Sequence, residues 1–434
     1  MFTFIFIGCA QKEVKPAKKV HIEIADLVNI PQDIAFFTKN IDNNISIYNI
    51  QKEYQRHYFK IWNIKKPPET VQSIQWSFYA YKAGSSYGEN LQLLNNSFFN
   101  KMHEDSNFDA FATLNKKGLT IRHASLRVFP THRPLLKDPT QAGEGFPFDY
   151  LQNSSIEANE PLFISHYSKN KEWVYVFSNF ASGWIETHDV VFLEDEYTEM
   201  WQKAEQIFIT QDDVPIFDSE DGSFLFNSKI GMLFALLEED EENYTVLTVS
   251  NYKKSEALFL KSRISKKIAH KGVFSLNKEY LEKIMNGIFD TNYGWGGIYN
   301  QRDCSSTLRD MYAPFGIWLP RNSFQQSKIG TTISLENLSD EEKIKLIKEK
   351  GIPFQTLLYK KGHIVLYVGT YHDEIIVFHN MWGIKTTKDG VEGRVVIGKT
   401  ILSTLKIGKN QLGYNENNTI LRNLKSMNIL TKKL

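Results

Sequence analysis

Cysteine is almost missing from this sequence, and its scarcity excludes several kinds of protein. Among 434 residues only Cys9 and Cys304 are present, at opposite ends of the chain. Two cysteines form at most one bridge, so the chain is no disulfide scaffold. A cysteine-rich zinc site needs three or four thiolates and is excluded as well. Each of the two cysteines therefore requires an explanation of its own.

Strong net charge and long apolar runs are absent too. The chain has 51 basic and 50 acidic residues, which is a formal net charge of +1. It lacks the positive field that holds nucleic acid through counterion release, and we expect no nucleic-acid partner. No uninterrupted apolar run approaches the roughly 18 residues that a membrane span requires. With 42% hydrophobic and 23% charged residues the composition is that of a globular protein, and the length predicts two or more domains.

The first residues predict where the protein is located. An apolar stretch, Phe2 to Ile7, runs into Gly8-Cys9 and resembles the end of a bacterial lipoprotein signal, whose cysteine is lipidated after cleavage. The stretch is short and has no basic residues, which predicts a natural start further upstream. Gln11 to Lys19 is polar and lysine-rich, as expected of a tether. We expect a periplasmic protein of the cell envelope with a lipid anchor at Cys9 as its only membrane attachment. The alternative is an accidental apolar N-terminus on a cytosolic protein.

The first two thirds of the chain predict a helical region followed by two small barrels. Residues 30–118 combine helix signals with aromatic stretches, and Pro67 and Pro68 stop any helix there. From Leu119, short alternating strands separated by glycine, serine, asparagine and proline predict a small β-barrel. A comparable series over residues 206–249 predicts a second one. Both resemble bacterial SH3 domains, and the first is the better match.

The last third has helices first and strands afterwards, which is α+β architecture. Residues 281–289 predict a short helix, and residues 292–297 form a glycine-rich loop. Cys304 to Phe315 has helical spacing, and Ser339 to Glu342 is a capping box that opens a further helix. The predicted strands that follow are 354–359, 363–368, 374–379 and 395–397.

Cys304 stands at the start of the predicted helix 304–315, between Asp303 and Ser305. The unpaired N–H groups and the positive end of the helix dipole favour an anion there, which predicts a lowered pKa for the thiol. The same N–H groups can receive the oxyanion of a tetrahedral intermediate. A lone cysteine is more often a small buried apolar residue than a nucleophile, so other residues must support a catalytic role.

Two histidines supply that support. His363 begins one predicted strand, and His379 ends the next. If these strands pair as antiparallel neighbours, both histidines lie near one edge of the sheet. A helix N-terminus packed on that edge brings Cys304 to His363. The three side chains then provide a nucleophile, a base and an orienting group.

The motifs around these residues resemble the NlpC/P60 cysteine peptidases in spacing and order. They are Tyr293-Gly-Trp295-Gly-Gly, Asp303-Cys304-Ser305, Gly362-His363-Ile-Val-Leu-Tyr-Val-Gly and His379-Asn-Met-Trp-Gly. The resemblance covers residues 281 to about 405. More loosely, the whole chain is similar to the subfamily with an N-terminal stabilising region and two bacterial SH3-type domains. Members with this architecture are cell-wall hydrolases, which typically cut the γ-D-glutamyl bond to the diamino acid in peptidoglycan stem peptides.

The resemblance implies a role for each matching residue. Cys304 is the nucleophile, His363 the general base and His379 the third polar member, which orients His363. The expected partners are peptidoglycan stem peptides or muropeptides, with diaminopimelate as the diamino acid, and no cofactor or metal is expected. The residues implied to line the stem-peptide groove are Trp295, Asp303, Ser305, Asn322 and Ser323, with Asp149 and Tyr150 from the first barrel.

Asn322 departs from the pattern of the relatives. Relatives often have aspartate at this position, where the carboxylate helps to hold the free amine of an N-terminal L-alanine. Asparagine accepts a hydrogen bond but supplies no charge. Strict selectivity for stems with a free N-terminus is therefore not expected here.

The predicted architecture is multidomain, with an α+β papain-like NlpC/P60 catalytic domain behind two small SH3-like β-barrels and a mostly helical N-terminal region. The predicted parts are a lipoprotein signal remnant (1–9), a tether (10–29), the helical stabilising region (30–118), the first barrel (119–195), the second barrel (196–272) and the catalytic domain (273–434).

Two other functions fit the same residues. An amidase that cuts between the sugar and L-alanine, or an acyltransferase, could use the same nucleophile and base. The glycine-rich loop with Trp295 close before Cys304 favours the endopeptidase. A catalytically inactive envelope lipoprotein that binds wall peptides is the second alternative, and the intact set of Cys304, His363 and His379 argues against it.

Overall fold

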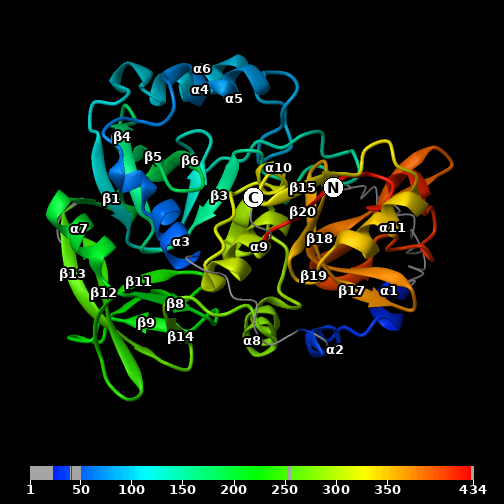
Figure 1. The fold of residues 1–434 in the computed structure, drawn as a ribbon. Coiled ribbons are helices and arrows are strands. Elements are labelled where there is room, and N and C mark those ends of the chain that lie inside the picture. Colours follow the sequence, from blue (N-terminus) through cyan, green and yellow to red (C-terminus); the bar gives the residue numbers. More distant parts are fainter. Residues whose placement is uncertain (1–22, 40, 42–49, 252–255, 432–434) are drawn as a thin grey trace, which may run out of the picture.

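The computed structural model describes residues 23–39, 41, 50–251 and 256–431 of the chain (Figure 1). Cys9 and the expected lipid-anchor signal lie outside the described residues. None of the helices within these ranges is long and apolar enough to cross a membrane. The described chain contains a helical region, two β-domains and an α+β domain, in the predicted order, and a short arm precedes them.

The arm consists of α1 (Ala25–Asn29) and α2 (Ile34–Thr38), and it packs on the α+β domain, far away in sequence. The buried Asp26 carboxylate accepts hydrogen bonds from Thr404 N at 2.8 Å and from Thr404 Oγ1 at 2.7 Å. Gln32 exchanges two hydrogen bonds with the backbone of Leu402. The expectation that residues 10–29 form a tether is therefore wrong from residue 23 onward, because these contacts fix the chain there.

Four helices follow the arm, and Figure 1 shows α4–α6 above the strands of the first β-domain. Trp62 is fully buried, and its Nε1 donates to Gly118 O at 3.0 Å, which joins this region to that domain. Pro67 and Pro68 fall in the helix-free stretch before α4, as helix-stopping residues should. The elements are α3 (Ile50–Tyr58), α4 (Val71–Ile74), α5 (Trp76–Ala80) and α6 (Asn96–Asp105), with 3₁₀ turns at Lys60–Asn63 and Phe108–Ala110.

The first β-domain is a seven-stranded antiparallel sheet in the order β3-β2-β6-β5-β4-β1-β7. Buried aliphatic side chains, including Leu126, Ile164 and Val176, form its core. Its strands are β1 (Lys116–Thr120), β2 (Ala124–Arg127), β3 (Gln152–Ile156), β4 (Pro161–Tyr167), β5 (Trp173–Phe177), β6 (Ser182–Glu186) and β7 (Val190–Leu193), with a 3₁₀ turn at Thr187–Asp189.

The second β-domain has a five-stranded antiparallel sheet in the order β13-β12-β11-β8-β14, and a separate β9–β10 hairpin. The helix α7 (Asp195–Lys203) links the two β-domains and buries Trp201 between them and the helical region. The strands are β8 (Gln206–Ile209), β9 (Pro215–Phe217), β10 (Phe224–Asn227), β11 (Leu233–Glu239), β12 (Asn243–Asn251), β13 (Ala257–Ser265) and β14 (Ala269–Lys271).

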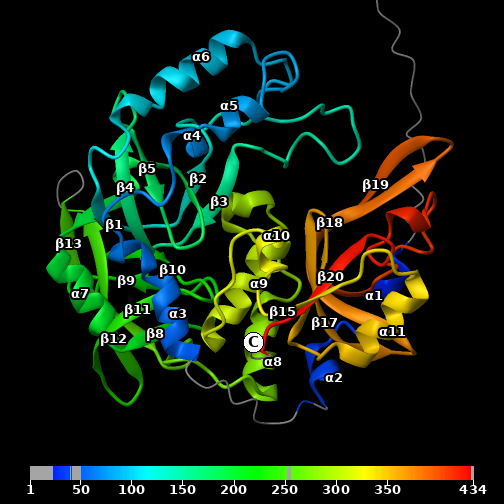
Figure 2. The same cartoon turned by 45° about the horizontal axis from the view of Figure 1, so that its top comes forward.

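The α+β domain has a six-stranded antiparallel sheet in the order β15-β20-β16-β17-β18-β19, and α9 packs across β17 and β18 (Figure 2). The strands are β15 (Thr331–Ser334), β16 (Thr356–Lys360), β17 (His363–Tyr371), β18 (Glu374–Lys388), β19 (Val391–Thr404) and β20 (Leu424–Ile429). The helices are α8 (Lys278–Ile288), α9 (Cys304–Tyr312), α10 (Ser323–Gln326) and α11 (Asp340–Lys350), with 3₁₀ turns at Trp295–Asn300, Ala313–Phe315 and Glu416–Asn418. The helices α8 to α10 precede the antiparallel sheet and α11 follows its first strand, which confirms the predicted α+β class.

The β18–β19 hairpin is much longer than the predicted strands 374–379 and 395–397. Its turn is Asp389-Gly390, with both residues at positive φ, which favours glycine or aspartate. The sequence reasoning missed the polar half of the hairpin because its residues do not alternate with an apolar face. Figure 2 shows this half extending away from the body of the sheet.

A buried charged cluster lies where the two β-domains meet α9. Arg309 pairs with Glu157 at 3.1 Å and with Asp310 at 2.9 Å, and Lys229 Nζ lies 3.4 Å from Glu157 Oε1. Burial and the neighbouring Glu157 charge raise the pKa of the buried Glu160 to about 8. Glu160 therefore holds a proton at neutral pH, while Glu157 remains charged between its basic partners.

Candidate active site

Cys304 is the first residue of α9, and its position follows from local sequence. Asp303 caps the helix, because its Oδ1 accepts from the backbone N–H groups of Ser305 at 3.1 Å and Ser306 at 2.9 Å. The face of α9 that packs on the sheet is apolar, with Leu308 and Met311 fully buried there. The helix is thereby held with its N-terminus, and Cys304, at the edge where β17 begins.

The two histidines form a hydrogen-bonded pair. His363, the first residue of β17, places its Nε2 2.9 Å from His379 Nδ1 on β18. His379 Nε2 lies 2.9 Å from Ser403 Oγ on β19, and Ser403 Oγ donates to Thr404 O at 2.9 Å. One polar chain therefore links the three neighbouring strands β17, β18 and β19.

This chain determines the tautomer of each ring. Because the Ser403 hydroxyl uses its proton on a carbonyl, it accepts a hydrogen bond from His379 Nε2–H. His379 Nδ1 is then an acceptor, and His363 Nε2–H donates to it. The remaining nitrogen, His363 Nδ1, carries a lone pair and can act as a base.

The thiol of Cys304 is protonated in this resting site. Burial, together with the Asp303 charge, raises the pKa of Cys304 to about 12, although the backbone N–H groups of Ile364 and Ser305 favour the thiolate. Burial and the neighbouring His379 hold the pKa of His363 well below its usual range, and burial lowers the pKa of His379 to about 3. The predicted lowered pKa of the thiol is therefore wrong, because loss of solvent outweighs the helix dipole.

Two groups near Cys304 can donate to an oxyanion. Asp303 occupies the N–H groups of Ser305 and Ser306, so the Cys304 N–H alone is without a partner among these first helical residues. Burial and the nearby Cys304 and Asp303 raise the pKa of Tyr293 well above its usual range, so its hydroxyl keeps its proton. We expected several helix N–H groups to bind the oxyanion. Among these first helical residues only the Cys304 N–H is available for it, and the Tyr293 hydroxyl is a second donor.

Asp303 and Ser305 belong to a buried hydrogen-bond network. Arg321 compensates the negative charge of Asp303 within it. Arg321 donates to Asp303 Oδ2 at 2.7 Å and to Ser305 Oγ at 3.0 Å, and its Nε donates to Ser154 Oγ of β3 at 2.6 Å. Burial raises the pKa of Asp303, but the Arg321 charge and hydrogen bonds outweigh it and hold that pKa below its usual range. The network ties the start of α9 to the first β-domain.

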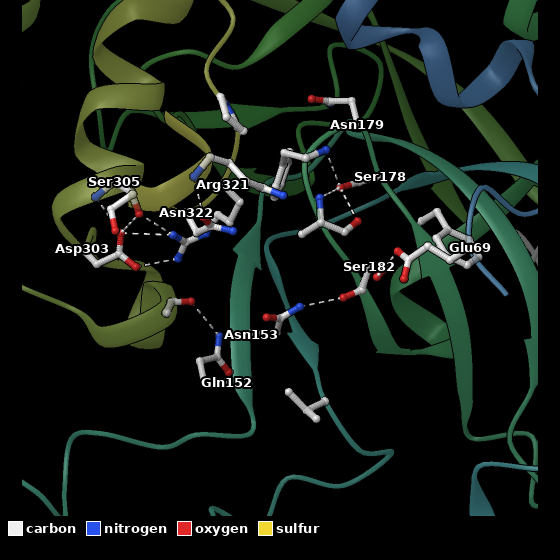
Figure 3. A pocket seen from close by; sticks show the side chains of 18 of the residues that line it. Glu69, Gln152, Asn153, Ser178, Asn179, Ser182, Asp303, Ser305, Arg321 and Asn322 are labelled. Carbon is white, nitrogen blue, oxygen red and sulfur yellow. Dashed lines mark hydrogen bonds and ion pairs between the residues drawn. The ribbon is translucent and has the colours of Figure 1, made fainter. Parts of the chain in front are cut away.

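A groove of about 940 Å³ opens beside Cys304 (Figure 3). The first β-domain and the helical region form its far wall, where Asn153 Nδ2 donates to Ser182 O at 2.8 Å and Ser182 Oγ donates to Glu69 Oε1 at 3.0 Å. Of the predicted groove residues, the lining includes Tyr150, Trp295, Asp303, Ser305, Asn322 and Ser323. The Asn322 Oδ1 caps α10 by accepting from Gln325 N at 2.9 Å.

The prediction that Asp149 contacts substrate is wrong. Its carboxylate pairs with Arg127 at 2.6 Å and accepts from the backbone N–H groups of Leu135 and Leu151. It is buried inside its own domain, where these partners compensate the charge. Its contact with the α+β domain is through the backbone, since Trp295 Nε1 donates to Asp149 O at 3.1 Å.

Sequence reasoning did not assign three residues of the site. Tyr293 was visible only as part of a motif, and Arg321 only as a neighbour of Asn322. One weak feature of the sequence points to Ser403: a hydroxyl residue follows directly after the apolar Ile401 and Leu402. It reaches His379 because His379 lies opposite Ile401 in the sheet, which makes Ser403 a diagonal neighbour two residues along β19.

Within the described chain, a group of side chains that could hold a metal ion lies away from this site. Glu186, His188 and Asp189 of the first β-domain place one ligand atom each within 4.8 Å of one another. Arg122 lies 3.3 Å from Asp189 there and already supplies positive charge. This group includes neither Cys304 nor the two histidines of the site.

Four family models match the chain in the order predicted from the sequence. They are the N-terminal stabilising domain of NLPC_P60 over residues 1–111, an SH3 domain of SH3b1 type over 134–186, an SH3 domain of SH3b2 type over 195–241, and the NlpC/P60 family over 290–388. They confirm the predicted resemblance. No curated protein matches the chain.

A solved structure shares the fold over nearly the whole chain. A novel NlpC/P60 endopeptidase from Photobacterium damselae subsp. piscicida is 23% identical with a TM-score of 0.80, and the match covers 93% of this chain and 98% of that one. An NlpC/P60 family protein from Bacillus cereus ATCC 10987 is 14% identical with a TM-score of 0.49, over 73% and 100% of the two chains. The first likeness extends over all four parts of the fold.

Proposed function

Since the chain belongs to the NlpC/P60 family of cysteine peptidases, we propose that it is a peptidoglycan hydrolase that cuts the bond between γ-D-glutamate and the diamino acid, diaminopimelate, of stem peptides. The observation that carries this proposal is Cys304 in the lining of a peptide-sized groove, together with the hydrogen-bonded chain of His363, His379 and Ser403. The first β-domain closes one side of that groove, which limits the width of the substrate and favours a single peptide chain. We also propose export and lipid attachment at Cys9, on the Gly8-Cys9 signal.

The tautomers of the site support the first half of the reaction. Cys304 Sγ attacks the γ-carbonyl carbon while its proton moves to His363 Nδ1. The Cys304 N–H and the Tyr293 hydroxyl receive the oxyanion. His363, now an imidazolium stabilised by its bond to His379, protonates the departing amine as the C–N bond breaks. A thioester between Cys304 and the γ-carboxyl group of D-glutamate remains.

The same groups complete the reaction. His363 Nδ1 removes a proton from a water molecule, and the resulting hydroxide attacks the thioester. The C–S bond breaks, the thiolate takes the proton back from His363, and a peptide ending in D-glutamate leaves. Because the resting pair is neutral, proton transfer and attack occur together, and the free thiol is a poor nucleophile without a bound substrate.

Product analysis by mass spectrometry tests the proposal. The substrates are L-alanyl-γ-D-glutamyl-diaminopimelate and the corresponding sugar-linked muropeptide, incubated with the protein from residue 18 onward. We expect free diaminopimelate, and a loss of roughly 10⁴-fold or more in rate for Cys304→Ala. The control is Lys101→Ala, an exposed lysine of α6. Release of the whole stem would show an amidase, and no cleavage of any substrate would leave a wall-binding protein.

A further inference from the structure

A second cavity, of about 460 Å³, is lined by His363 and neighbours the groove. The groove is lined by Cys304 and the cavity by His363, and both are lined by Tyr150, Tyr293 and Trp295. The two spaces therefore adjoin along these three aromatic side chains. An extended substrate can occupy both, with its scissile bond between them.

The chemistry of the proposed function decides which half of the substrate each space holds. The acyl part becomes bonded to Cys304 and remains in the groove. The departing amine takes its proton from His363, so the leaving group lies beside that ring, in the second cavity. If the proposed function is right, this cavity holds the diamino acid.

Two cations line this cavity. Lys360 ends β16 next to His363, and Arg394 projects from β19. Neither forms an ion pair within 4.0 Å among the described residues. The Arg394 guanidinium donates one hydrogen bond, to Ala142 O at 3.3 Å, and its Nε is buried without a partner. Burial lowers the pKa of both groups, and the charge of Arg394 further lowers that of Lys360, whereas the charges of Glu392 and Glu144 act in the opposite direction on Arg394.

Among the described residues, one acidic side chain belongs to the cavity lining. Glu144 lines the cavity, and its Oε2 accepts from the Tyr150 hydroxyl at 2.9 Å. Lys137 lies 3.8 Å from it on the outer side. Two further lysines line the cavity: Lys361 is exposed, and Lys385 is paired with Glu392. The cavity thus has a cationic side at Lys360 and Arg394, and an anionic point at Glu144.

We propose that this cavity is a subsite for the free amino-acid head group at the distal end of the diamino acid, with Arg394 and Lys360 binding its carboxylate and Glu144 binding its ammonium. Diaminopimelate carries both groups on its distal carbon, whereas lysine carries the ammonium alone. A lysine side chain would leave the two cations without an anion and add a third positive charge beside them. The cavity therefore selects diaminopimelate-type stems against lysine-type stems.

Peptide kinetics test this subsite directly. The probes are L-alanyl-γ-D-glutamyl tripeptides that end in meso-diaminopimelate, in its distal carboxamide, or in L-lysine. For the wild-type protein we expect kcat/KM to be about 10- to 100-fold lower for the lysine peptide, with the carboxamide in between. In Arg394→Gln the diaminopimelate value falls toward the lysine value, which itself stays within a few-fold. Arg422→Gln, an exposed arginine of the same domain, should leave all three values unchanged.

Product inhibition of the unmodified protein gives a measurement that does not depend on folding of the variant. Free meso-diaminopimelate should inhibit at a concentration at least about tenfold below that of L-lysine. Equal kcat/KM for the three peptides, or equal inhibition by the two amino acids, would overturn the subsite and leave the proposed endopeptidase intact. Absence of any cleavage, with Cys304 intact, would instead overturn the proposed function.

Discussion

The two SH3-like domains share one type of fold but meet the catalytic domain in different ways. The first supplies a wall of the groove: Gln152 of β3 donates to Gly296 O at 3.2 Å, and Ser154 accepts from Arg321. This approach requires the glycines after Trp295, since a Cβ on Gly296 would lie 2.4 Å from Gln152 O. In the described chain, no residue of the second domain lines either cavity.

The second domain instead anchors the segment that leads to Cys304. Asp212 accepts two hydrogen bonds from Arg302, and Lys229 Nζ donates to Asn300 Oδ1 at 3.0 Å. Arg302 also pairs with Asp310 inside α9 at 2.7 Å. Two domains of the same fold type therefore have different roles. The first is the substrate-facing copy, because it lines the groove, and the second is the bracing copy, because it holds the segment before Cys304. A few edge residues make the difference, since function depends on the site and not on the fold.

Arg321→Gln should give the largest effect, because it removes the ion pair on the first-domain side. Asp303 would keep a buried charge next to Cys304 with only hydroxyl and backbone donors. Loss of one partner of a buried pair costs about 3–5 kcal/mol, and the start of α9 would shift with it. We expect this loss in urea unfolding together with near-complete loss of activity. Arg263→Gln, which breaks an exposed pair of the second domain with Asp240, should cost at most about 1 kcal/mol.

Glu160 at the junction of the two domains predicts a pH-dependent stability. Its pKa rises from 4.5 to about 8 on folding, so the folded protein holds a proton that the unfolded chain releases. This stabilisation is fully present below pH 4.5 and is lost as pH rises toward 8, by at most about 1.4 kcal/mol per pH unit. Thermal unfolding at pH 5 to 8 should show this decline, and Glu160→Gln should flatten it. An unchanged slope in the variant would assign the decline to other groups.

Part of this arrangement was predictable from the sequence and part was not. Cys304, the two histidines and the helix at 304 follow from short motifs and local spacing, and so does the order of the domains. Ser403 and Arg321 could not be assigned, since strand register and loop packing place them. The docking of Asp26 on Thr404 spans 378 residues, and no local propensity encodes it. The raised pKa of Cys304 depends on burial, which only the assembled domains determine.

Asp212→Asn tests the bracing copy and should have a smaller effect than Arg321→Gln. Arg302 keeps Asp310 as a partner, and the amide oxygen can still accept one hydrogen bond. We expect a loss of about 1–2 kcal/mol in stability, a few-fold lower kcat and an unchanged KM, because no described residue of the second domain lines the groove. A clear rise in KM would contradict the division of roles between the two copies.

Asn322→Asp tests whether the groove wall opposite the first domain recognises the N-terminal amine of the substrate, and it should have the smallest effect. Asn322 lies in the groove lining opposite the first domain, and its Oδ1 caps α10. Aspartate caps a helix as well as asparagine does, so folding should be unaffected. The new carboxylate is exposed, and an exposed ion pair contributes about 0.2–1 kcal/mol, which limits the gain to a few-fold. Peptides with a free N-terminal amine should therefore gain a few-fold in kcat/KM, while the sugar-linked muropeptide, which has no such amine, should not. An equal gain for both substrates would mean that residue 322 acts on the shape of the groove and not on the amine.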